Sequence, residues 1–169
     1  MRLFGRREQP PAEALAALDR DERVVSWGSA AGGGAVLATP LGLWLPGATE
    51  RISWHLIDKA TWQDGVLSVV AARDTGDGVL DELPARSVRI AVPRDLPHTV
   101  RSRVERTIAS TRYYRLPTGS GVRVVGRRVP GRDGVSWQLV FDPGVDRDDP
   151  AVRTAAAEMV RQSRSFFEA

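Results

Sequence analysis

Hydrophobic positions recur with a period of two over most of residues 23–92. Seven short runs carry the pattern, separated by turn residues: RVVSWGS, GAVLAT, LGLWLP, RISW, KATWQ, VLSVVAA and SVRIAV. Because successive side chains of a strand point to opposite faces, this spacing is typical of an antiparallel barrel or sandwich. Asp64-Gly65 favours a tight hairpin between KATWQ and VLSVVAA, since both residues tolerate a positive φ. RDTGDG, at residues 73–78, is predicted to be an exposed loop.

A helix is predicted over residues 95–111, where the apolar period lengthens. Asp95 and Pro97 suit its first turn, and its apolar stripe consists of Leu96, Val100, Val104 and Ile108. A shorter helix is predicted after Pro10-Pro11, with Ala14, Leu15 and Leu18 on its apolar side.

A second strand-rich stretch follows, with the runs YYRLPT, GVRVVGRRV and VSWQLVFD. Asp149 as cap and Pro150 in the first turn predict a final helix over residues 150–167, and its buried side would include Val152, Ala156, Met159 and Phe166. We expect Trp137 and Phe141 to pack against this helix. A unit of this size is close to the lower limit for independent stability, so it should share an interface with the first.

Residues 51–70 contain two tryptophans and a histidine. Ile52 and Trp54 share one strand face, as do Ala60 and Trp62, so the indoles fall where a packed sheet needs apolar groups. We therefore expect both indoles in the core, and an aromatic ligand cage is the alternative. His55 is expected at the rim of the sheet.

The order of these segments resembles the bacterial pleckstrin-homology-like domains. The resemblance rests on LATPLGLWLP, then RISWHLIDKATW with its Trp54–Ile57 segment, then Asp-Gly and VLSVV, and it covers residues 12–112. It implies a barrel closed by the helix of residues 95–111. The chain departs from many relatives in having Pro40-Leu41-Gly42 where they have an arginine near the turn. As a whole, the chain resembles uncharacterised actinobacterial proteins.

The expected fold class is therefore α+β, in three parts. Residues 1–9 would be a flexible tail, residues 10–112 a pleckstrin-homology-like antiparallel barrel or sandwich with its closing helix, and residues 113–169 a small β-β-β-α unit packed on the barrel. The chain has no cysteine, its first residues MRLFGRREQPP lack the apolar stretch of a secretory signal, and no apolar run is long enough to span a membrane. We expect a cytoplasmic protein.

Known chemical motifs are mostly excluded. GSAAGGGA at residues 28–35 lacks the lysine of a phosphate-binding loop, and it lacks the basic residues that the resemblance would require for phosphoinositide binding. No nucleophile elbow is present, and the aspartates at 142, 146, 148 and 149 do not follow a calcium-loop order. We therefore predict no catalytic residue, no metal site and no cofactor. An enzymatic alternative would require His55 or His98 to be buried beside a carboxylate.

Arginines are the remaining candidates for a contact surface. The chain has 24 basic and 21 acidic residues, a net charge of +3, and Lys59 is its only lysine. Residues 123 and 127 share strand parity, which predicts a basic stripe. The candidate contacts for an anion or a partner are Arg101, Arg112, Arg123, Arg127 and Arg128. Solvated surface is the alternative interpretation.

Two functional hypotheses follow. The first is a non-enzymatic module that binds a protein or peptide partner, in which an exposed barrel edge accepts a strand. The alternative is binding of an anionic surface, membrane lipid or nucleic acid, through the arginine rows. The sequence leaves homo-oligomerisation open.

Overall fold

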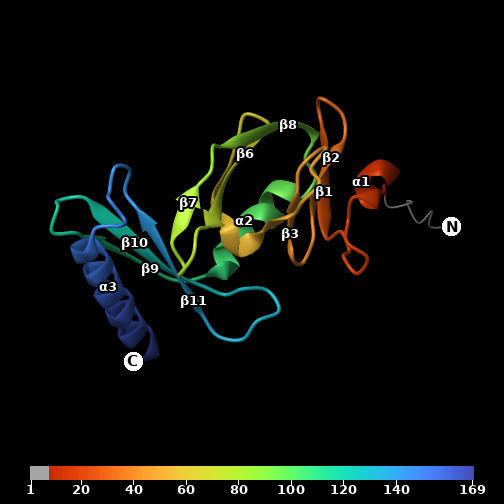
Figure 1. The fold of residues 1–169 in the computed structure, drawn as a ribbon. Coiled ribbons are helices and arrows are strands. Elements are labelled where there is room, and N and C mark those ends of the chain that lie inside the picture. Colours follow the sequence, from red (N-terminus) through yellow and green to blue (C-terminus); the bar gives the residue numbers. More distant parts are fainter. Residues whose placement is uncertain (1–7) are drawn as a thin grey trace.

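The computed structural model describes residues 8–169, in which two antiparallel sheets and three α-helices form an elongated molecule (Figure 1). Most of the predicted tail at residues 1–9 lies outside the described residues. The first sheet contains β1 (Ser26–Ala30), β2 (Ala35–Ala38), β3 (Gly42–Trp44), β4 (Ile52–Ser53), β5 (Ile57–Gln63), β6 (Val66–Asp74), β7 (Leu80–Glu82) and β8 (Arg86–Val92). Its strand order is β4-β3-β2-β1-β8-β6-β5, and β7 pairs with the end of β6.

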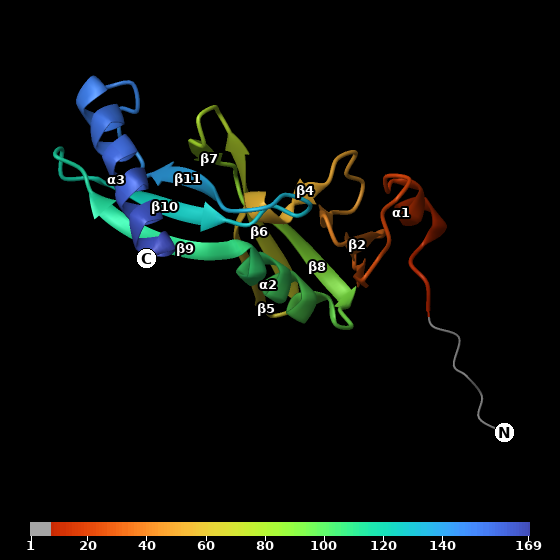
Figure 2. The ribbon, with the colours of Figure 1, turned by 90° about the horizontal axis from the view of Figure 1, so that it is seen from below.

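The first sheet curls into a half-barrel, and α2 (Leu96–Thr107) packs in its open side (Figures 1 and 2). The apolar positions of the strands and of α2 meet in one core, which explains the period of two in the strands and its change in the helix. Trp54 is 1% exposed at the centre of this core, and its Nε1 donates a 2.9 Å hydrogen bond to the carbonyl of Thr39. The prediction of buried aromatic packing is confirmed for Trp54.

The hairpin signal at Asp64-Gly65 is also confirmed. The two residues have φ angles of 50° and 76°, and they join Gln63 of β5 to its partner Val66 of β6. Most residues with a Cβ tolerate such positive φ angles poorly, whereas aspartate and glycine accept them. The turn fixes the register that places Trp62 opposite Leu67.

The second sheet contains β9 (Ile108–Arg115), β10 (Gly121–Arg127) and β11 (Ser136–Phe141), in the order β11-β10-β9. The helix α3 (Pro150–Glu168) covers one of its faces (Figure 1). Its predicted start is confirmed, because the side chain of Asp149 accepts a 2.8 Å hydrogen bond from the N–H of Ala151. Trp137 and Phe141 are half-buried under the helix, as expected. Phe166 was predicted to be buried, but it is 62% exposed, and its ring lies against Arg112 at the end of α3.

The predicted helix of residues 95–111 is too long. It ends at Thr107, and Ile108 begins β9 directly, opposite Arg127 of β10. The cause is that the chain beyond Thr107 pairs with β10 instead of continuing the helical hydrogen bonds. Ile108 therefore does not join the apolar stripe of the helix and is 37% exposed.

The half-barrel and the second sheet touch along β7 and β11. Leu139 of β11 donates a 2.8 Å backbone hydrogen bond to Gly78, in the loop predicted to be exposed. Residues 73–77 are exposed as predicted, whereas Gly78 and the following Val79 are partly buried against β11. Gly78 has a φ of 76°, and a Cβ there would lie 2.5 Å from the carbonyl oxygen of Trp137, so this approach requires glycine. A small apolar cluster lies beside it and contains Leu56, Ala72, Leu80 and Val140.

The short helix α1 (Ala12–Ala16) lies at the opposite end of the molecule from α3 (Figures 1 and 2). Its residue Ala14 and the following Leu18 pack on the outer face of the half-barrel, against Leu37 and Trp44. The predicted apolar side of this helix is confirmed for these two residues, whereas Leu15 is 36% exposed.

Candidate functional site

The free edge of β5 is the candidate site. β5 is the last strand of the half-barrel sheet and pairs only with β6. A bulge interrupts this pairing at Asp58, after which Lys59 to Gln63 pair regularly with β6. An unpaired strand edge exposes backbone donors and acceptors that can pair with another chain.

The backbone groups of Ala60 and Trp62 point to this free side. A two-residue turn makes the flanking residues Gln63 and Val66 a hydrogen-bonded pair, and bonded and non-bonded pairs alternate along the strands. Thr61 therefore bonds to β6, and Ala60 and Trp62 face away. Among residues 8–169, no backbone hydrogen bond from a turn or loop reaches these two residues.

A groove of about 700 Å³ runs along this edge, between β5 and α2. Its apolar lining consists of Ala60, Trp62, Leu67, Pro97, Val100 and Val104. This volume is within the range of ligand clefts in proteins, roughly 300–1,000 Å³. The groove is therefore large enough for side chains of an added strand.

Trp62 does not belong to the core, contrary to the expectation for both indoles. It lies on the same face as Ala60, as its parity predicts, and opposite the buried Leu67. It is nevertheless 39% exposed, because β5 has no neighbouring strand on that side and α2 leaves the groove beside it. The two tryptophans of this stretch thus have different environments.

The charged residues beside the groove are Asp58, Lys59, Arg101 and Glu105, and His98 also lines it. Both carboxylates have a cation: Asp58 pairs with Arg123 of β10 at 2.6 Å, and Glu105 pairs with Arg101 at 2.8 Å. Within residues 8–169, no carboxylate oxygen lies within ion-pair distance of Lys59. Lys59 is therefore the charged residue along this edge that has no ion-pair partner among the described residues.

Two of the predicted arginine contacts lie inside the junction of the two sheets. Arg123 and Arg127 do share one face of β10, as their parity predicts, but that face is turned toward the half-barrel. Arg127 is 3% exposed; it donates hydrogen bonds to the hydroxyl of Thr107 and to the carbonyl of Ile57. Burial lowers its pKa. These bonds give Arg127 a structural role between α2 and β5.

The other three predicted contacts are exposed and do not gather at the groove. Arg112 lies 4.2 Å from the ring centre of Phe166, on the side of the sheet that carries α3. Arg128 follows β10, and its N–H donates to the carbonyl of Thr107. Arg101 alone lines the groove, where its hydrogen bond with Glu105 raises its pKa.

The two histidines lie in different places. His55 is part of the 3₁₀ turn η1 (Trp54–Leu56), and its carbonyl accepts a 3.2 Å hydrogen bond from Gln138 of β11. Burial lowers the pKa of His55, and the charges of Arg127 and Arg132 lower it further. These neighbours are cations, not the carboxylate that an acid–base site would require. His98 is exposed at the mouth of the groove, a position that its place in the first helical turn did not reveal.

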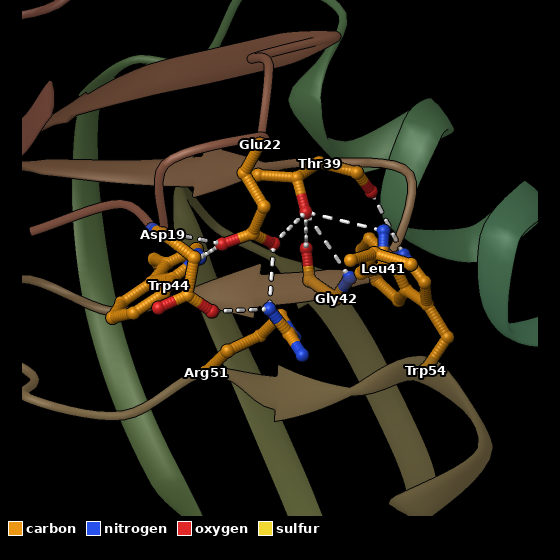
Figure 3. Close-up of polar contacts among 8 residues, drawn as sticks. All are labelled: Asp19, Glu22, Thr39, Leu41, Gly42, Trp44, Arg51 and Trp54. Atoms are coloured by element: carbon orange, nitrogen blue, oxygen red, sulfur yellow. Dashed lines mark hydrogen bonds and ion pairs between the residues drawn. The ribbon is translucent and has the colours of Figure 1, made fainter. Parts of the chain in front are cut away.

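A buried polar cluster surrounds Glu22 and contains none of the residues that line the groove (Figure 3). The side chain of Glu22 is 1% exposed, and it accepts hydrogen bonds from Thr39 and from Nε1 of Trp44. Arg51 lies 2.9 Å from the same carboxylate. These protein groups supply the hydrogen bonds and the ion pair of the buried carboxylate. The cluster therefore anchors the segment after α1 to the sheet.

Within residues 8–169, no three potential ligands of the His, Cys, Asp or Glu type are grouped for a metal ion. In the same part of the chain, no helix combines the length and apolar character needed to cross a bilayer. Comparison of the sequence and fold with known proteins finds no matching family model, curated protein or solved structure.

Proposed function

We propose that this chain is a non-enzymatic cytoplasmic interaction module that binds an extended peptide of a partner protein along β5. The peptide adds a strand to the half-barrel, and alternate side chains enter the groove between β5 and α2. This mode of recognition takes its affinity from main-chain hydrogen bonds and its selectivity from pockets for every second side chain.

One observation carries the proposal: a free strand edge and an apolar groove coincide at Trp62. On the free side of β5, Ala60 and Trp62 lie beside this groove.

The proposal extends to the fold family. The half-barrel over residues 12–112 is proposed to be a pleckstrin-homology-like domain. Support comes from the order of its antiparallel strands and from α2, which follows the last strand and closes the open side. Strand addition beside this helix needs no basic residue in the loop after β1.

Selection of short random peptides on the full chain tests the function. We expect the enriched peptides to bind W62A at least about tenfold more weakly than the natural chain, since exposed tryptophans are frequent anchors of interfaces. F166A is the matched control, because Phe166 is an exposed aromatic residue on α3 and does not line the groove. Failure to enrich peptides, or equal binding to W62A, would contradict the proposal.

A scan of N-methylated peptides then tests strand addition itself. Methyl groups on alternate amides should abolish binding in one register and leave it intact in the other, because only every second N–H of an added strand faces β5. A loss that is independent of register would show a different binding mode.

A further inference from the structure

We infer that the peptide of this groove carries a bulky apolar side chain and a carboxylate an odd number of positions away from it. The inference rests on the proposed strand addition at β5 and specifies the chemistry of its partner. Two features of β5 carry it: the groove lies on one face of the strand, and an unpaired cation lies on the other.

The apolar side chain belongs on the inner face. Ala60 packs against the core of the half-barrel, and its partner on β6 is the buried Val69. Trp62 and Leu67 share this face. Residues that lie opposite each other on neighbouring strands project to the same side of the sheet. A peptide residue level with Ala60 or Trp62 therefore points toward Val100 and Val104, which line the groove.

The carboxylate belongs on the outer face. Lys59 precedes Ala60 and pairs with Val70, so its side chain projects from the side opposite to the core. It is exposed and has no carboxylate partner within residues 8–169. Asp58 and Glu105, the acidic groups of the groove, already pair with Arg123 and Arg101. An acidic residue level with Lys59 forms a cross-strand pair of opposite charge.

The spacing follows from the two faces. Side chains of an extended peptide alternate, so an apolar residue on the inner face and an acid on the outer face are separated by an odd number of positions. An even separation directs the carboxylate into the apolar groove, where its desolvation opposes binding. The groove therefore distinguishes a peptide with the odd separation from a peptide of the same composition with an even separation.

Blocked synthetic peptides test the inference. The host peptide alternates threonine and valine and contains one leucine. In its acidic version, aspartate lies next to the leucine. One control has asparagine at that position, and the other has aspartate one position farther from the leucine. We expect the acidic version to bind the full chain about two- to fivefold more tightly than the asparagine control, the range of an exposed ion pair. The displaced aspartate should bind more weakly than either.

Substitution of Lys59 makes the test specific. In Lys59→Gln the preference for aspartate over asparagine should disappear, while the asparagine peptide keeps its affinity. Arg106→Gln is the matched control, because it removes an exposed cation from α2 outside the groove and should preserve the preference.

Three results would overturn the inference. Equal binding of all the peptides would contradict the preference for an acidic partner but would remain consistent with strand addition at β5. A preference for aspartate that persists in Lys59→Gln would assign the anion to another cation. Binding of no host peptide, combined with a dimer of the chain that W62A dissolves, would show that a second copy occupies the edge.

Discussion

Arg123 of β10 forms an ion pair with Asp58 of β5, with 2.6 Å between Nη2 and Oδ1. The same Nη2 lies 3.4 Å from a carboxylate oxygen of Glu82. A hydrogen bond with Asp58 raises the pKa of Glu82, and burial and the charge of Asp58 raise it further. One guanidinium from the second sheet thus holds two carboxylates of the half-barrel together.

Removal of this cation should destabilise the chain in a pH-dependent way. We expect R123Q to lower the free energy of unfolding near pH 7 by about 1–2 kcal/mol, because two neighbouring carboxylates lose their shared partner. A raised folded pKa of Glu82 contributes stability at low pH that is lost as the pH rises through it. The loss should therefore shrink near pH 4, where Glu82 is more protonated. Urea unfolding of R123Q and of R106Q, the exposed control, measures this; equal losses at both pH values would contradict it.

The buried cluster around Glu22 predicts that E22A and E22Q lose different amounts of stability. E22A leaves the indole N–H of Trp44 without its acceptor and leaves Arg51 with only the exposed Asp19 as a partner, and should cost about 2–4 kcal/mol. E22Q keeps one acceptor oxygen and should cost less. Denaturant unfolding followed by tryptophan fluorescence gives both values. If the two variants were equally stable, the carboxylate would not hold this segment in place.

His55 predicts an acid-sensitive junction. Burial and two arginines lower its folded pKa from an ordinary value near 6.5. A lowered folded pKa contributes stability that is present above the unfolded pKa and is lost as the pH falls through the folded one. The free energy of unfolding should therefore decline from about pH 6.5 downward, and H55Q should reduce that slope. Unfolding midpoints measured across this range give the comparison; parallel pH profiles for the two proteins would rule out His55.

The two tryptophans near the middle of the chain should differ in their energetic weight. W54A removes a fully buried indole and should cost about 3–5 kcal/mol. W62A removes a part-exposed one from a groove, and its cost should stay below about 1.5 kcal/mol. Thermal or urea unfolding of the two variants measures the difference. Similar losses would mean that Trp62 supports the core and is not available to a partner.

Local chemistry made several features predictable. Asp64-Gly65 specifies its turn through backbone angles, and Asp149 specifies the start of α3 through its side chain, so neither depends on distant residues. Strand parity was also readable, because it depends only on alternation. It correctly placed Trp62 with Ala60 on one face, and Arg123 with Arg127 on another.

Whether each of these strand faces is buried or exposed could not be predicted in the same way. Whether Trp62 is covered depends on which strand lies next to β5, and the single sequence contains no signal for this neighbour. The face of Arg123 and Arg127 was expected at the surface, but it is turned toward the half-barrel, which buries Arg127 and leaves Arg123 partly exposed. The candidate groove itself, with His98 and Lys59 at its margins, arises from the sheet order and could not be found from spacing alone.

The direct passage from Thr107 of α2 to Ile108 of β9 gives the molecule a mechanical property. α2 forms one wall of the groove, and β9 is an outer strand of the second sheet. No loop residue separates the two elements. Arg127 braces this passage from the side through Thr107 and Ile57. A displacement of that wall is therefore transmitted directly to the first strand of the second sheet.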